Sequence, residues 1–430
     1  MKKSIMISAY VAILTSFFSA QIFTFDFGLF QLSLFRMSMM VLSILLLVYM
    51  IRNFKEVKLR LFNRKALFAL FLIVWLIYAL ITVIWVKDLY AAIRSLYFLY
   101  SGVVLAVALV LVINSEIQFK HIINIIFTMI ALHNIIGWFE IFTRQYYFVS
   151  AERLNVLLSF DLRLPVSMFG NQNEFGMMVF VGFFIALLFS QTQTNQWLKK
   201  LGLLVAISCV ILIFIGQSRG IIMGFFIALA VYVYVAKPIK HYRLGALFFF
   251  IMSIVFGIGS GVIFEVINDL LYPNQNPVNP EDLNSIFIRI NLIKNGLYFL
   301  VKTWGLGTGV GNLEYWMGHY GLYQTNEIVN MHNWWVEILA TYGVLIFSLY
   351  MVYYIKLATG LWKIYKRYQS QMAVGFIAIM GGFIIACISS STNMTKEWLW
   401  VFWSIVTAYV SYHQLRDSTS SESDSASVVE

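Results

Sequence analysis

Two arginines and a histidine stand out in this chain because their polarity conflicts with their surroundings. Arg219, Arg289 and His332 each lie beside or within long apolar stretches. In a membrane protein, cationic or titratable side chains at such positions are costly, so they usually mark a working site. A guanidinium can hold a phosphate through two parallel hydrogen bonds, and a neutral imidazole can accept a proton. Together these groups could stabilise a departing phosphate and activate a nucleophile.

Arg219 lies in the run Gly216-Gln217-Ser218-Arg219-Gly220, a short break between two apolar segments. One interpretation is an arginine that reaches out to lipid phosphate. We favour a dedicated anion ligand, because basic residues on this side of the membrane run against the charge bias described below.

Arg289 lies in a segment, about 283–302, whose pattern predicts a helix. One face of that helix forms a polar stripe made of Asn291, Lys294, Asn295, Tyr298 and Lys302. Arg289 lies on the opposite face, in line with Ile293, Gly296 and Leu300. A solvated arginine would join the polar stripe, so we expect Arg289 to face protein or lipid headgroups and to need an anionic partner.

His332 precedes Asn333, a good N-cap for an apolar helix that starts at Trp334. His332 could simply be part of that cap. A helix N-terminus, however, disfavours an imidazolium and keeps the ring neutral and able to accept a proton. Glu337, about one turn further on, could orient the ring or could face a polar cavity.

A glycine run at 305–311 separates Arg289 from His332. The amides of Gly307, Gly309 and Gly311 could bind a phosphate, although such a string is more often a flexible turn. No βαβ unit surrounds it, so it is not a dinucleotide-binding fingerprint.

Composition identifies the elements that must position these groups as membrane helices. Of the 430 residues, 60% are hydrophobic and 12% are charged, which excludes a soluble domain. Runs of about 17–25 apolar residues predict roughly twelve spans and an all-α fold. The approximate spans are 4–23, 29–51, 66–86, 96–113, 122–142, 175–190, 198–216, 220–236, 244–264, 334–356, 372–391 and 397–413.

Charge distribution predicts the orientation. With the N-terminus in the cytoplasm, 19 of the 30 Lys and Arg residues lie on the cytoplasmic side. Both termini are then cytoplasmic, and Arg219, Arg289 and His332 lie outside. The surplus charge of +10 reflects this topology and contact with the bilayer, and is not a nucleic-acid footprint. Bulky Phe18 near the only candidate cleavage site indicates an uncleaved first span.

The domain organisation is simple. Residues 1–413 form one multi-span domain with outer segments at about 143–174 and 265–333. The larger segment opens with a Pro/Asn-rich stretch at 272–282 that cannot be a regular helix. Residues 414–430 are rich in Ser and acids, which predicts a disordered cytoplasmic tail. Cys209 and Cys387 lie inside spans and suggest neither a disulfide nor a metal site.

An ordered set of motifs resembles the O-antigen ligase and O-antigen polymerase superfamily, which includes Wzy-type polymerases. The set comprises Gly170-Asn171-Gln172-Asn173, Gln217-Ser218-Arg219-Gly220, Arg289, the glycine run 305–311, His332-Asn333 and residues 338–345. It covers about 165–350. Gln172 departs from the proline that many members have there.

The resemblance implies a metal-independent GT-C-type glycosyltransferase of the bacterial cell membrane, with no cofactor. Its donor would be a glycan on undecaprenyl diphosphate, and its acceptor a second glycan. Arg219 and Arg289 match the family arginines that hold the diphosphate, and His332 matches the histidine thought to activate the acceptor hydroxyl. Asn333, Glu337 and the glycines are candidate supporting residues. A flippase and a chain-length regulator would be further partners. In-line displacement would invert the anomeric centre.

Three functions remain open at this point. A polymerase joins lipid-linked repeat units outside the membrane, whereas a ligase moves finished glycan to a lipid or cell-wall acceptor. We favour the polymerase, because a ligase requires a particular acceptor that many bacteria lack. A flippase for the same substrate would predict charges along a midplane passage and an internal repeat, and the sequence shows neither.

Overall fold

The computed structural model is all-helical, as predicted, apart from one antiparallel pair of two-residue strands. It describes residues 1–18, 25–26, 31–62, 68–149, 154, 164–169, 171–236, 243–255, 285–390 and 393–427. The elements are α1 (Lys2–Thr15), β1 (Phe25–Asp26), β2 (Gln31–Leu32), α2 (Leu34–Arg52), α3 (Phe54–Leu61), α4 (Phe68–Thr82), α5 (Leu89–Val112), α6 (Glu116–Thr143), α8 (Gln172–Thr192), α9 (Gln196–Ile215), α10 (Arg219–Ala236), α12 (Ser285–Lys302), α13 (Leu313–Tyr320), α14 (Trp334–Tyr368), α15 (Gln371–Ala386), η1 (Asn393–Thr395) and α16 (Glu397–Ser427). A further helix covers Arg243–Val255.

Each predicted span overlaps a helix of the described residues, although spans 4–23 and 244–264 extend beyond them. Among these residues, seven helices are long and apolar enough to cross a membrane. Three shorter apolar helices accompany them, namely Phe68–Thr82, Arg243–Val255 and Gln371–Ala386. The polytopic helical architecture is therefore confirmed, and the figure of twelve spans stays a prediction.

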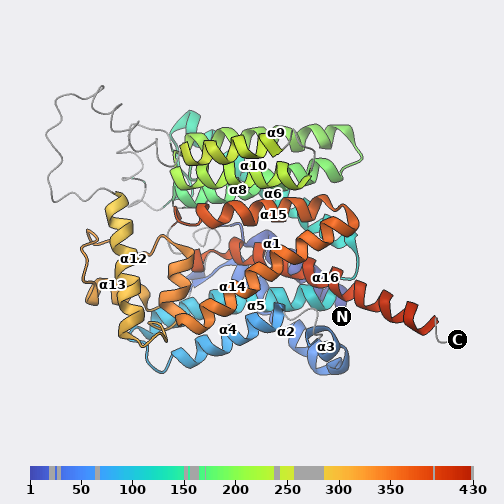
Figure 1. The fold of residues 1–430 in the computed structure, drawn as a ribbon, viewed down its shortest axis with the longest axis horizontal. Helices are drawn as coiled ribbons and strands as arrows, with labels where there is room; N and C mark the ends of the chain where they lie inside the picture. The colour runs from blue at the N-terminus through green and yellow to red at the C-terminus, as the bar shows by residue number, and fades with distance from the viewer. Residues whose placement is uncertain are drawn as a thin grey trace.

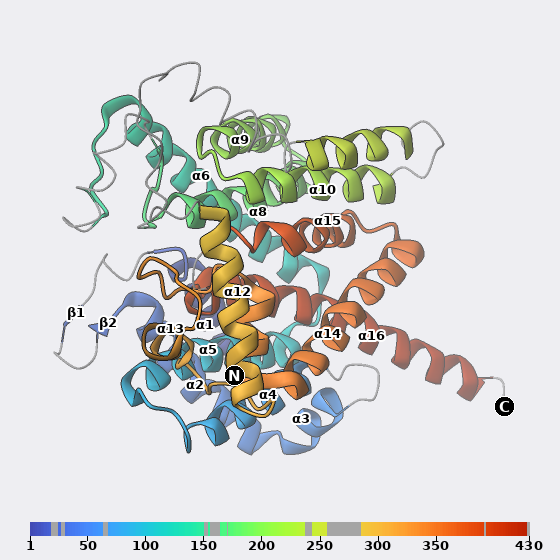
Figure 2. The ribbon, with the colours of Figure 1, turned by 60° about the vertical axis from the view of Figure 1, so that its left-hand side comes forward.

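The long helices lie side by side, and α12 and α13 lie across one end of the bundle (Figures 1 and 2). Within the bundle α10 packs on α15, α8 on α9, and α5 on α16, while α12 and α13 both contact α14. An ion pair of 2.6 Å between Lys2 and Glu56 joins the start of the chain to α3. Figure 1 shows both toward the end away from α12. The predicted outer helix and the basic N-terminal segments therefore lie at opposite ends.

Small residues allow α10 and α15 to approach closely. A Cβ added to Gly224 would lie 2.7 Å from the carbonyl oxygen of Gly382 and 2.7 Å from Cβ of Ala386. Side chains at these positions would force the helices apart. The resulting contact fixes the first turn of α10 against the end of α15, which matters for the site below.

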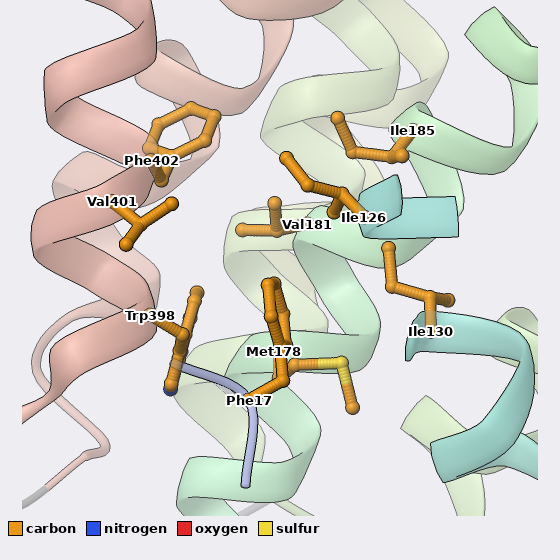
Figure 3. A pocket seen from close by; sticks show the side chains of 9 residues that line it. All are labelled: Phe17, Ile126, Ile130, Met178, Val181, Ile185, Trp398, Val401 and Phe402. Atoms are coloured by element: carbon orange, nitrogen blue, oxygen red, sulfur yellow. The ribbon is translucent and has the colours of Figure 1, made fainter. Parts of the chain in front are cut away.

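The seam between α6, α8 and α16 is filled by apolar side chains. Figure 3 shows nine of them around a single void of about 10 Å³, which has room for at most one water. They are Phe17, Ile126, Ile130, Met178, Val181, Ile185, Trp398, Val401 and Phe402. Around this void the bundle is packed as an apolar core.

The disorder predicted from residue 414 stays a prediction, and the start of that segment continues helix α16. Helix α16 continues to Ser427, and Asp417 pairs with Arg367 of α14 at 3.0 Å. The hydroxyl of Tyr368 also donates to Asp417. These contacts join the first residues of the predicted tail to α14.

Candidate functional site

Arg219 is the first residue of α10. Helix α9 ends at Ile215, Gln217 adopts a left-handed conformation with φ +50°, and α10 then begins. The neighbouring Gly220 lies directly against the side chain of Ser389, which follows α15, so a Cβ there would overlap the serine hydroxyl. Arg219 therefore projects from a helix N-terminus, which carries partial positive charge, and is held beside the end of α15.

His332 immediately precedes the Asn333 cap of α14. The Oδ1 atom of Asn333 accepts hydrogen bonds from the amides of Trp335 at 3.1 Å and Val336 at 3.2 Å, as its predicted capping role requires. His332 has φ +50°, and its ring hydrogen-bonds to the backbone of Ser389. Ser389 is thus a shared neighbour of His332 and of the first turn of α10.

Arg289 lies on the face of α12 that packs toward α14. On the same face, a Cβ added to Gly296 would lie 2.7 Å from Cε of Met331 and 3.1 Å from Cγ1 of Val336. These two residues flank His332 and Asn333 in the sequence. The half-buried Arg289 therefore faces protein, as its position opposite the polar stripe predicted.

Arg289 lies within electrostatic reach of both Arg219 and His332. Burial lowers the pKa of Arg289 from its usual range, and the charge of Arg219 lowers it further. Burial also lowers the pKa of His332, the charge of Arg289 adds to this, and the bond to Ser389 opposes it. The Nδ1 atom of His332 is buried and has no hydrogen-bond partner among the described residues. The arrangement favours a neutral imidazole beside two cations, which suits an anionic ligand.

The polar stripe of α12 differs from the prediction. Asn295, expected to face solvent, is only 1% exposed. Its Oδ1 accepts the amides of Leu322 and Tyr323, both at 2.9 Å, and its Nδ2 donates to the carbonyl of Tyr323 at 2.8 Å. The stripe therefore holds the segment that follows α13, and Arg289 is left on the face toward α14.

The glycine run does not present its amides to a phosphate. The amide of Gly307 donates to Oγ1 of Thr303 at 3.1 Å, and that of Gly309 donates to the carbonyl of Thr341 at 3.0 Å. Gly311 lies against the backbone of Ala91. The phosphate-binding interpretation is therefore wrong for Gly307 and Gly309, because their donors are used within the protein.

The glycine run instead secures a break in α14. Gly343 has φ +78° and ψ 179°, so the helical hydrogen bonds stop there. The carbonyl of Ala340 accepts the amide of Thr308 at 2.8 Å, and the amide of Val344 donates to Gly305 at 2.9 Å. Non-helical backbone inside a membrane protein requires such internal partners. The first part of α14, which carries Glu337, is thereby attached to the loop that connects α12 and α13.

A cavity of about 500 Å³ opens beside this first part of α14. Residues from α5, the end of the glycine run, α13, α14 and the segment before α16 line it, and Asn330, Met331 and Glu337 are among them. Arg219, Arg289 and His332 are not. Of the two roles left open for Glu337, the structure shows that it faces this polar cavity.

Sequence reasoning missed a polar cluster close to the cavity. Lys396 lines the cavity and forms an ion pair of 2.5 Å with Glu174 at the start of α8. Partly buried Glu397 lies within electrostatic reach of Arg36 and Glu174. The adjacent charges of Lys396 and Glu397 at the start of the last span were the available signal. Within the described ranges no three His, Cys, Asp or Glu side chains are grouped as metal ligands.

Comparison with known proteins supports the relationship suggested by the motifs. Residues 202–351, which include Arg219, Arg289 and His332, match the family model described as O-antigen ligase. The chain is also similar to the "Teichuronic acid biosynthesis protein TuaE" of Bacillus subtilis (strain 168), with 29% identity over 350 residues, 79% of this chain and 71% of that protein. Both similarities support an O-antigen ligase or polymerase type of superfamily, and with it a membrane enzyme of polysaccharide biosynthesis.

Proposed function

We propose that this protein polymerises undecaprenyl-diphosphate-linked repeat units into a cell-surface polysaccharide on the outer face of the bacterial cell membrane. The observation that carries the proposal is the convergence of Arg219, Arg289 and His332 from three separate helices and loops. The similarity to a protein named for teichuronic acid biosynthesis favours a cell-envelope polysaccharide as product.

The proposed chemistry follows from the charges. The bond between the donor sugar and the diphosphate breaks, and negative charge grows on the departing diphosphate. Arg219 and Arg289 would stabilise that charge without a metal ion, aided by the N-terminus of α10. The acceptor hydroxyl attacks the anomeric carbon from the opposite side, and its proton passes to the neutral ring of His332. A single displacement of this kind inverts the anomeric centre.

The bond from His332 to the backbone of Ser389 gives the ring a fixed orientation. Ser389 also packs on Gly220, beside Arg219. The segment around Ser389 therefore contacts both the proposed base and the helix turn that carries the proposed diphosphate ligand Arg219. We infer that this shared support sets the spacing between the acceptor hydroxyl and the leaving group, on which proximity effects depend.

The first experiment separates polymerase from ligase. Cells lacking the gene would be extracted, and their lipid-linked glycans analysed by mass spectrometry. We expect single repeat units to accumulate, because polymerisation is blocked. Accumulation of finished polymer on the lipid carrier would instead identify a ligase.

The second experiment tests the site. Arg219→Ala, Arg289→Ala and His332→Ala would each be expressed in the deletion strain and the glycan chain length measured. Loss of one such contact typically costs about 10²- to 10³-fold in rate. Arg→Lys should rescue only partly, because a point charge loses the bidentate geometry. Arg144→Ala and His319→Ala are matched controls, because both residues are exposed and lie outside the cluster. Normal polymer from all three site variants, at normal membrane levels, would refute the assignment.

Metal independence is tested in the same system. Membranes containing the wild-type protein should extend lipid-linked repeats equally well with and without a chelator of divalent cations. Activity that disappears with the chelator and returns with added Mg²⁺ or Mn²⁺ would contradict the arginine-based mechanism.

A further inference from the structure

The cavity beside α14 lies next to the proposed base but apart from the proposed diphosphate ligands. Arg289 lies within electrostatic reach of both Arg219 and His332. Asn330 and Met331, which lead directly into His332, line the cavity, whereas neither arginine does. A substrate group in the cavity would therefore lie beside the segment that leads into His332, while neither arginine borders it.

The lining of the cavity suits a sugar. It combines hydroxyl and amide side chains with charged groups of both signs from separate elements, among them Ser95, Asn330, Thr341, Glu337 and Lys396. Such groups can match the many hydroxyls of a sugar, each of which both donates and accepts hydrogen bonds. The volume of about 500 Å³ falls in the range of roughly 300–1,000 Å³ typical of small-ligand sites.

Glu337 is the most informative of these residues. Its side chain is only 6% exposed, yet it borders the cavity. A carboxylate at this depth is stabilised by the N-terminal turn of α14 and is an acceptor with two oxygens. It lies one turn after the Asn333 cap, in the part of α14 that the glycine run holds in place. A sugar hydrogen-bonded to it would be aligned with respect to His332.

Lys396 supplies a second fixed point on a different element. Its ammonium is held by Glu174 at 2.5 Å, with side-chain exposures of only 18% and 13%. A held ammonium can donate to a sugar oxygen without losing much side-chain entropy on binding. The cavity thus has a prepared acceptor on α14 and a prepared donor before α16.

We propose that this cavity is the binding site for the terminal sugar of the acceptor glycan, with Glu337 accepting hydrogen bonds from hydroxyls next to the attacking one. The proposal rests on the proposed transferase function. It assigns Glu337 to acceptor binding and selectivity, and leaves the diphosphate to Arg219 and Arg289.

The test measures donor and acceptor separately. The full-length protein would be purified into lipid nanodiscs. The donor is the lipid-linked repeat unit extracted from the deletion strain. The acceptor is the same repeat oligosaccharide released from its diphosphate by mild acid, so it has no leaving group and can serve only as acceptor. Lipid-free products one repeat longer are quantified by mass spectrometry while each substrate is varied in turn.

We expect Glu337→Gln to raise the acceptor KM about tenfold, with the donor KM unchanged, because a hydrogen bond to a charged acceptor is weakened. Ser95→Phe, which fills the cavity from α5, should raise the acceptor KM at least as much. Matched controls are Glu327→Gln in the outer loop and Ile93→Phe on α5, both exposed residues that do not line the cavity.

Four outcomes overturn the inference while leaving transferase activity intact. These are an unchanged acceptor KM in both cavity variants, a change confined to the donor KM, a fall in kcat alone, or wild-type protein that polymerises lipid-linked repeats but never extends the free oligosaccharide. Wild-type protein that consumes no lipid-linked repeat at all would instead refute the proposed function.

Discussion

Replacing Gly307 with alanine tests whether the glycine run supports the site. Gly307 has φ +87°, and a Cβ there would overlap the carbonyl of Thr341 and lie 2.6 Å from the amide nitrogen of Gly343. Both are backbone atoms, so no change of rotamer can relieve the clash. The run would have to move away from α14.

The expected cost can be worked out from these contacts. A left-handed conformation costs an L-residue about 1–2 kcal/mol. Displacing the run also weakens the bonds from Thr308 to Ala340, from Gly309 to Thr341 and from Val344 to Gly305. At about 0.5–1.5 kcal/mol for each of these bonds, the total destabilisation is roughly 3–6 kcal/mol. Because α14 carries His332 at its start, transfer activity should fall as well.

The assay is the melting midpoint of the detergent-solubilised protein, read as the fraction that remains monodisperse after heating. Gly318→Ala is the matched control, because its Cβ would meet only Val329, at 3.7 Å, within helix α13. We expect the control to melt at or slightly above the wild-type temperature and Gly307→Ala to melt several degrees lower. Equal midpoints for Gly307→Ala and wild type would show that the run does not hold α14.

Three further predictions concern pH, a buried amide and an ion pair. The pKa of His332 lies below its ordinary value of 6.5, so the base is neutral at pH 7 and the rate should fall only when pH drops through that lowered pKa. Because the pKa of His332 is lower in the folded protein than in the unfolded chain, the unfolded chain takes up this proton first as the pH falls. His332 therefore lowers the stability of the fold below pH 6.5. His332→Gln should reduce this loss of stability, measured as the melting midpoint at acid pH. Asn312→Leu should destabilise by about 2–5 kcal/mol in the same melting assay, because Oδ1 of this fully buried Asn accepts the amides of Lys87 and Asp88 at 2.6 and 2.9 Å; an unchanged midpoint would contradict this. Glu174→Gln should cost about 1–3 kcal/mol, and a double-mutant cycle with Lys396→Met should show that the two effects are not additive.

Hydropathy predicted the helical elements well because lipid leaves few alternatives to a helix. The helix at 285–302 was also predictable, and so was the inward orientation of Arg289, since both depend on local periodicity. Arg219 and His332 were recognised as candidate site residues because each is a cationic or titratable residue beside an apolar stretch. Their proximity was not derivable from periodicity, because it depends on Ser389, which has no distinguishing local signal.

The errors share a physical cause. Asn295 was expected to face solvent because it is polar, and the glycine run was expected to form a flexible turn or to bind phosphate. Both instead form hydrogen bonds with segments that are distant in sequence. At the start of the tail, Asp417 pairs with Arg367 of α14, which is 50 residues away in the sequence. The cavity beside Glu337 is enclosed by residues from 88 to 396, so no local window could reveal it.

The discontinuity at Gly343 has a mechanical consequence. Membrane helices tilt when the thickness of the surrounding lipid changes. The long portion of α14 after Gly343 can respond in this way, whereas the short portion before it is hydrogen-bonded through Ala340 and Thr341 to the loop that connects α12 and α13. The break would therefore act as a hinge, so that His332 keeps its position relative to this loop while the portion of α14 after Gly343 changes its tilt.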